Sequence, residues 1–129
     1  HMYERAGTGD TSPASIVNIS SDAGRRGTIG QINYGAAKSG VMGITMSAAR
    51  EYAAKGIRGN SICFGVVETE MTEMIRSDKF RDGVMAQVPM KRFSDPEEVS
   101  QPVCFLLSQA ASYITGQHLS VNGGYTIGV

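Results

Sequence analysis

The stretch that decides the fold runs from residue 18 to residue 38 and reads Asn18-Ile-Ser-Ser-Asp-Ala-Gly-Arg-Arg-Gly-Thr-Ile-Gly-Gln-Ile-Asn-Tyr-Gly-Ala-Ala-Lys38. It begins as the end of an apolar strand, passes through a glycine-rich loop and enters a helix. It places Ser21 thirteen residues before Tyr34, and Tyr34 four residues before Lys38. Because residues four apart share one face of a helix, we expect the phenol and the ammonium side by side, next to a hydroxyl from the strand end.

Size and composition bound what the rest of the chain can be. The chain has 129 residues, 41% of them hydrophobic, and a formal net charge of zero, which fits one domain with a modest core. Neutrality gives no reason to expect nucleic acid or an anionic membrane as a partner. No apolar run approaches the roughly 20 residues of a membrane helix and no signal peptide is visible, so we expect a cytoplasmic protein. The two cysteines, Cys63 and Cys104, lie far apart among apolar residues and predict reduced core thiols, not a metal site.

The segments on either side of this stretch alternate between predicted strands and predicted helices. Residues 1–14 predict a cloning scar and a flexible arm, and residues 15–129 predict one α/β domain. Strands are expected at 15–20, 59–64 and 119–121. Helices are expected at 32–54, from a cap at Thr69 or Thr72 toward residue 80, and from Pro96 to about 108 with Asp95 as N-cap. A flexible loop is expected over 21–31 and a mobile segment over 81–93. This order implies parallel strands, and ligands of such sheets bind beyond the carboxyl ends of the strands. Ser21, Tyr34 and Gly65 are thereby directed to one rim.

The long helix should have two distinct faces. Its apolar stripe is predicted to hold Ala37, Val41, Ile44, Ala48 and Tyr52. A second face carries small residues, at 36, 40, 43 and 47. Glycine inside a helix costs up to about 1 kcal/mol relative to alanine, so we expect this second face to approach another backbone closely.

The trio of side chains suits proton transfer to or from an oxygen. A neighbouring ammonium favours the charged form of a phenol, so Tyr34 beside Lys38 could act as a general acid or base. Ser21 could bind a carbonyl or alcohol oxygen and stabilise charge on it. A carbonyl–alcohol interconversion at such a site requires a nicotinamide cofactor for the hydride. Two plainer interpretations stay open: a helical Tyr/Lys pair often reflects surface packing, and a serine after a strand is often a cap.

These residues resemble the short-chain dehydrogenase/reductase family, over a match that begins near Ser15 and extends to the C-terminus. The strand ending in Ser21 is similar to the family's serine-bearing strand, and residues 33–38 are similar to its Tyr-x-x-x-Lys segment. Residues 65–72 resemble the loop at the nicotinamide end, and three further segments resemble the C-terminal signature: 89–99, 113–116 and 121–124. Among subgroups, the 3-oxoacyl-[acyl-carrier-protein] reductases are the most similar.

The resemblance implies roles for individual residues. Ser21, Tyr34 and Lys38 would be catalytic, and Lys38 would also hold the nicotinamide ribose. Gly65 would lie at the nicotinamide, Val67 would meet the carboxamide through its backbone, and Thr69 would bond the carboxamide or the pyrophosphate. The implied cofactor is NADP or NAD, with no metal. Two positions depart from the family pattern: Phe64 replaces a proline, and Gly59 replaces a β-branched residue.

The implied fold is the C-terminal half of a Rossmann-like, doubly wound parallel sheet of about three strands. The family's first strands, glycine-rich pyrophosphate loop and helix asparagine have no counterpart in these 129 residues. Two hypotheses follow. One is an NAD(P)(H)-dependent oxidoreductase acting on a small carbonyl or alcohol substrate, with Tyr34 as general acid/base and homo-oligomerisation. The other is a non-catalytic fragment whose exposed sheet edge and small-residue helix face are covered by association or domain swapping.

Overall fold

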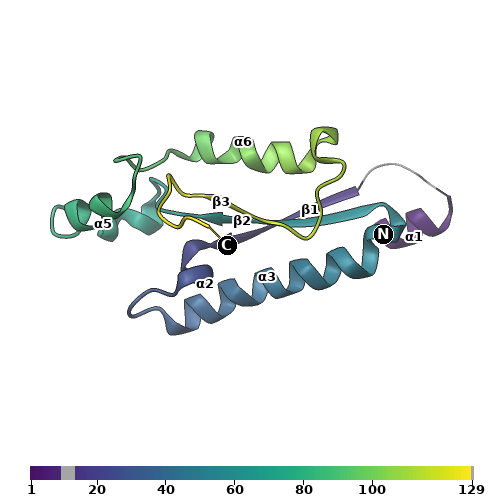
Figure 1. Cartoon of the computed structure of the whole chain (residues 1–129), viewed down its shortest axis with the longest axis horizontal. Helices are drawn as coiled ribbons and strands as arrows, with labels where there is room; N and C mark the ends of the chain where they lie inside the picture. The colour runs from purple at the N-terminus through teal and green to yellow at the C-terminus, as the bar shows by residue number, and fades with distance from the viewer. Residues whose placement is uncertain (10–13, 129) are drawn as a thin grey trace.

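The computed structural model describes residues 1–9 and 14–128 and is a three-layer α/β arrangement. Its sheet has three parallel strands in the order β1 (Ala14–Ser21), β2 (Ile57–Phe64) and β3 (His118–Val121). Helix α3 (Ile32–Tyr52) covers one face of the sheet and α6 (Pro96–Leu107) covers the other (Figure 1). The three-stranded parallel half-sheet expected from the sequence is confirmed.

Shorter elements fill segments for which loops were expected. They are α1 (Met2–Gly7), α2 (Asp22–Arg26), η1 (Ala53–Lys55), η2 (Glu70–Thr72), α4 (Glu73–Arg76), α5 (Arg81–Gln87) and η3 (Gln109–Ala111). The segment expected to be a flexible arm contains α1, where the Tyr3 ring packs edge-on against that of Tyr52, with 6.0 Å between centroids. Residues 10–13 of that arm lie outside the described residues.

The other corrections concern the segments around the site. The loop prediction for 21–31 missed α2, which forms because the Ser21 side chain caps it, accepting from the backbone N–H of Ala23 at 3.2 Å. Of the two expected caps, Thr69 precedes a 3-10 turn and Thr72 is the N-cap of α4, which ends at Arg76 and does not reach residue 80. The segment at 81–93 contains α5.

The core lies between the sheet and α6. Ile62, Leu106 and Ala111 are its most buried members, and Val17 and Phe64 pack against them from the strands. Burial of such side chains contributes on the order of 1.5–3 kcal/mol each.

The two cysteines have different environments. Cys63 is fully buried, and burial raises the pKa of its thiol, which therefore stays protonated and unreactive near neutral pH. Cys104 is exposed on α6, so its assignment to the core was wrong. Both are free thiols.

The buried stripe of α3 differs from the predicted one. Ile44 is 65% exposed, whereas its neighbour Thr45 is fully buried. Thr45 tolerates burial because its hydroxyl donates to the Val41 carbonyl at 2.8 Å and accepts from the Asn18 amide at 2.9 Å. Within the described chain, no atom from outside α3 lies within 4 Å of a Cβ built at position 40 or 43, so the close approach expected at the small residues stays a prediction for a contact with another chain.

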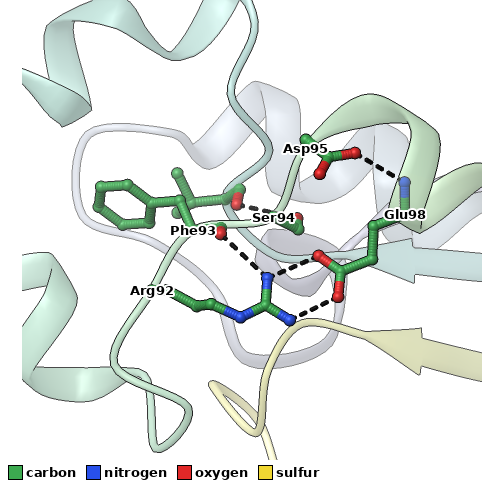
Figure 2. A network of polar contacts seen from close by, with 6 residues as sticks. Arg92, Phe93, Ser94, Asp95 and Glu98 are labelled. Atoms are coloured by element: carbon green, nitrogen blue, oxygen red, sulfur yellow. Dashed lines mark hydrogen bonds and ion pairs between the residues drawn. The ribbon is translucent and has the colours of Figure 1, made fainter.

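Helix α6 begins where the sequence predicts. Asp95 is its N-cap and accepts from the backbone N–H of Glu98 at 2.8 Å, and Pro96 takes the first helical position. Figure 2 shows the guanidinium of Arg92 facing the carboxylate of Glu98 as a two-pronged ion pair. Ser94 joins this turn to the loop after β2 through its backbone N–H, which donates to the Val66 carbonyl.

Candidate active site

The end of β1 is fastened to α3 by two hydrogen bonds that run in opposite directions. The Ser20 hydroxyl donates to the backbone carbonyl of Lys38 at 2.7 Å. The Lys38 ammonium donates back to the carbonyl of Ile19 at 3.0 Å. Because both bonds involve one residue of the helix, they fix its distance from the strand end. Ser21, at the end of β1, is thereby held at a defined distance from the helix that carries Tyr34.

Helix α2 packs against α3 at the same point because Gly24 has no side chain. A Cβ built there would lie 2.7 Å from the carbonyl carbon of Lys38 and 2.8 Å from the nitrogen of Ser39. The Ser39 hydroxyl donates to the Gly24 carbonyl across this contact. The glycine is therefore required for the close approach of α2 to α3.

Ser21 and Tyr34 line one cavity at the carboxyl ends of the strands, with a volume of about 480 Å³. Gly65 lines it too, as expected from its place after β2. Most of the remaining wall is apolar and comes from the loops and helices on either side of the sheet end: Ala23, Ile29, Phe64, Val66, Met71, Met74, Ile75, Phe80, Val84 and Tyr125.

The Ser21 hydroxyl has its proton free. Its oxygen accepts from Ala23, and no atom of the described chain accepts a hydrogen bond from it. It can therefore donate to an oxygen placed in the cavity, which is what stabilising a developing oxyanion requires. Ser20 cannot take this role, because it is 2% exposed and already donates to Lys38.

Tyr34 and Lys38 are neighbours, as their spacing predicts. The ammonium nitrogen lies 5.7 Å from the centre of the Tyr34 ring, near the outer limit of cation–π contact. Lys38 is not among the residues that line the cavity, and one of its donors is used by Ile19. Its remaining donors have no partner among the described residues.

The loop after β2 brings only part of the predicted cofactor set to the cavity. Val67 and Thr69 do not line it. The Val67 carbonyl accepts from the hydroxyl of Thr72, and Thr69 precedes η2 as its N-cap. Gly65 is closely backed, since a Cβ built there would lie 2.8 Å from that of Asn122. The cavity wall here is therefore bare backbone.

Sequence reasoning missed the contribution of the C-terminal segment. Asp22, directly after Ser21, accepts from the Asn122 amide at 2.7 Å. Burial raises the pKa of the Asp22 carboxyl, against the opposing effects of this hydrogen bond and of the nearby arginines. Arg25 donates to the Ser120 hydroxyl at 2.7 Å, and Tyr125 completes the cavity wall. These partners lie about a hundred residues from α2, and no local pattern could have joined them.

Met71, Met74 and Ile75 contribute apolar side chains to the cavity that holds Ser21 and Tyr34. Val88 lines a second cavity of about 440 Å³, between the loop after β2, the start of α6 and β3, and Met85 lines neither cavity. In the described part of the chain, no three His, Cys, Asp or Glu side chains are placed to hold a metal ion. No helix of residues 1–9 and 14–128 is long and apolar enough to cross a membrane.

A strand-end serine and a Tyr-x-x-x-Lys helix on one rim of a parallel sheet define the class of the short-chain dehydrogenases/reductases. The family model described as enoyl-(acyl carrier protein) reductase matches residues 2–126. The chain therefore belongs to the short-chain dehydrogenase/reductase family.

Individual relatives agree with this assignment. An acetoacetyl-CoA reductase of Synechocystis is 47% identical over 96% of this chain, and a 3-oxoacyl-[acyl-carrier-protein] reductase of Vibrio cholerae is 48% identical over 84%. A structure titled as a putative 2-deoxy-D-gluconate 3-dehydrogenase from Agrobacterium tumefaciens with bound NADP superimposes with a TM-score of 0.87 at 37% identity, over 95% of this chain and 49% of that one. The chain spans about half the length of the relatives it matches, 49% and 44% for the two reductases.

Proposed function

We propose that the chain carries the chemical end of an NAD(P)(H)-dependent oxidoreductase that interconverts a carbonyl and an alcohol, with a 3-oxoacyl thioester as the model substrate. The observation that carries this proposal is the shared cavity of Ser21 and Tyr34, with the Lys38 ammonium beside the tyrosine ring. Bound NADP or NAD would supply or accept the hydride. In the reductive direction, Tyr34 Oη gives a proton to the carbonyl oxygen, while the free Ser21 hydroxyl donates a hydrogen bond to that same oxygen.

The residues present fit the nicotinamide end of such a cofactor. The backbone of Gly65 and the side chain of Val66 lie in the same cavity as the proposed acid. The unpartnered donors of Lys38 suit ribose hydroxyls, because an ammonium offers three donors and Ile19 takes one. Val67 and Thr69 are assigned to the carboxamide by the family resemblance, and they would reach it from just beyond the cavity wall.

Titration of the chain with NADH and with NADPH, followed by cofactor fluorescence, tests the proposal. Saturable binding in the micromolar range would favour this proposal over a non-catalytic fragment, and reduction of acetoacetyl-CoA is then measured by loss of absorbance of the reduced cofactor. Tyr34→Phe should abolish reduction while leaving far-UV circular dichroism unchanged. Tyr52→Phe, at the far end of the same helix, is the matched control and should retain activity. Absence of cofactor binding, or undiminished turnover by Tyr34→Phe, contradicts the proposal.

A second candidate is a non-catalytic, self-associating chain, and the outer edge of β1 favours it. No strand of the described residues pairs with this edge, and Ile16 and Ile19 on β1 are 37% and 44% exposed. Exposed strand edges invite pairing with another chain. Light scattering after size exclusion should show a homo-oligomer. A monomer that unfolds cooperatively would remove this candidate.

A further inference from the structure

The two arginines of α2, Arg25 and Arg26, make different contacts. The Arg25 guanidinium uses its donors within the chain, binding the Ser120 hydroxyl and the carbonyls of His118 and Gly128. The central carbon of the Arg26 guanidinium instead lies over the ring of Tyr125, 3.8 Å from its centre. No described residue accepts a hydrogen bond from Arg26. Its five N–H donors are therefore available to a ligand.

The platform beneath Arg26 is itself fixed. Tyr125 belongs to the C-terminal segment, which hydrogen bonds to α2 both before and after this residue. Asp22 accepts from the Asn122 amide, and Arg25 donates to the Gly128 carbonyl. The backbone N–H of Tyr125 also donates to the Asn122 carbonyl at 3.1 Å. Stacking on a fixed ring orients a guanidinium at low entropic cost, because the side chain is already confined before a ligand arrives.

Tyr125 is a wall residue of the cavity that holds Ser21 and Tyr34. The Arg26 side chain is exposed to solvent on that ring, so its charge stands next to the cavity but is not buried in it. The wall from α4 and α5 contributes uncharged, largely apolar side chains, among them Met74, Phe80 and Val84. A ligand in this cavity therefore contacts a largely apolar wall on one side and lies near the Arg26 guanidinium, unpaired within the described chain, beside Tyr125.

The local charge balance leaves this cation available. Helix α2 carries two guanidiniums and one carboxylate, that of Asp22. Asp22 is a wall residue of the cavity, but it is 2% exposed and its carboxylate accepts from the Asn122 amide, so little of its charge faces solvent. Helix α2 therefore has a net charge of one positive unit, and Arg26 is its exposed charged residue.

We propose that Arg26, stacked on Tyr125, binds an anionic group, carboxylate or phosphate, on an otherwise apolar substrate whose reacting oxygen lies at Ser21 and Tyr34. Arg26 is thus a specificity-determining residue that selects amphiphilic anions over neutral molecules of the same length. The proposal rests on the proposed function for the identity of the reacting end, but the anion contact needs neither cofactor nor turnover. A planar guanidinium suits both candidate anions, because each can accept two parallel N–H bonds.

Binding of three probes that share an eight-carbon chain tests the assignment: octanoate, octyl phosphate and 1-octanol. Dissociation constants are measured on the isotopically labelled chain by amide chemical-shift titration at pH 7.5. Octanoate and octyl phosphate should bind about five- to tenfold tighter than 1-octanol, the range expected of a partly solvated charge-assisted contact. Their shifts should centre on Tyr125 and Ile29. The ratio between the two anions tells whether carboxylate or phosphate is preferred.

Variants assign the contact to its residue. Arg26→Gln should erase the preference for anions and leave 1-octanol binding unchanged. Arg50→Gln, which removes the same charge from an exposed position near the end of α3, is the control and should behave as the wild type. Tyr125→Phe keeps the ring and should keep the preference, whereas Tyr125→Leu should reduce it. Equal binding of anions and 1-octanol, or equal losses in Arg26→Gln and Arg50→Gln, would overturn the proposal.

The outcome is separable from that of the proposed function. Tyr34→Phe should bind octanoate like the wild type, because it removes the acid and not the anion contact. If acetoacetyl-CoA is not reduced but the Arg26-dependent preference is observed, the proposed chemistry fails and the anion site stands. If reduction proceeds and no preference is observed, the anion site fails alone.

Discussion

Replacing Gly24 by alanine tests whether the contact of α2 with α3 holds the site together. The added Cβ would lie 2.7, 2.8 and 2.9 Å from the carbonyl carbon of Lys38, the nitrogen of Ser39 and the Cβ of Lys38. Ordinary contacts between carbon atoms begin at about 3.5 Å, so the two helices must separate by about 0.8 Å. The nearest two atoms are backbone, and no rotamer change can relieve the clash.

The expected cost follows from two opposing effects. Overpacking of this kind costs about 1–3 kcal/mol, while alanine in a helix gains up to about 1 kcal/mol over glycine. We expect the free energy of unfolding of Gly24→Ala to fall by about 1–2 kcal/mol. The separation also stretches the hydrogen bond from Ser39 to Gly24 and displaces α2, which begins next to Ser21.

Urea unfolding followed by far-UV circular dichroism measures this loss. The matched control is Gly40→Ala in α3, where an added Cβ meets no described atom within 4 Å. That control should gain up to about 1 kcal/mol from helix propensity alone. The two glycine-to-alanine changes should therefore differ in sign. A Gly24→Ala chain as stable as the wild type, or more stable, would refute the close contact of α2 with α3.

Two further predictions concern buried polar groups. Burial lowers the pKa of His118, with repulsion from Arg25 as the second cause, so protonation favours the unfolded chain. The free energy of unfolding should therefore fall as pH drops below the unfolded pKa of about 6.5. His118→Gln should show a smaller difference in that free energy between pH 7.5 and pH 5.5, and an unchanged difference would contradict the assignment to His118. Ser20→Ala leaves the Lys38 carbonyl without its 2.7 Å donor and should cost about 1–2 kcal/mol in urea unfolding, whereas exposed Ser112→Ala should cost less than about 0.5 kcal/mol; equal effects would contradict the fastening of β1 to Lys38.

The sheet and the placement of Tyr34 beside Lys38 could be predicted from the sequence, because both depend on local signals. Strand β1 has the β-branched content that predicts a strand, although Ile16 and Ile19 are partly exposed. Asp95 followed by Pro96 marks a helix start that needs no tertiary information. The spacing of Tyr34 and Lys38 is likewise a property of one helix. Such signals survive in a single sequence because neighbours along the chain are neighbours in space.

The features that could not be predicted from the sequence depend on contacts between residues far apart in the chain. Cys104 sits between Val103 and Phe105, yet it is exposed, because apolar neighbours along a helix do not say which face is covered. Thr45 is buried because Asn18, twenty-seven residues earlier, supplies a donor to its hydroxyl. Tyr125 joins the cavity through contacts of its segment with α2.

The two consecutive serines show how a local signal and a tertiary one combine at the site. Alternation along β1 sends Ser20 and Ser21 to different surroundings. Ser20 is buried and donates to Lys38, so it fixes the helix that carries the proposed acid. Ser21 lines the cavity, and its hydroxyl proton is free to be donated because the oxygen only accepts, from the backbone N–H of Ala23. The spacing that identifies Ser21 in the sequence thus acquires a defined geometry through Ser20, and the capping of α2 leaves the Ser21 hydroxyl able to donate.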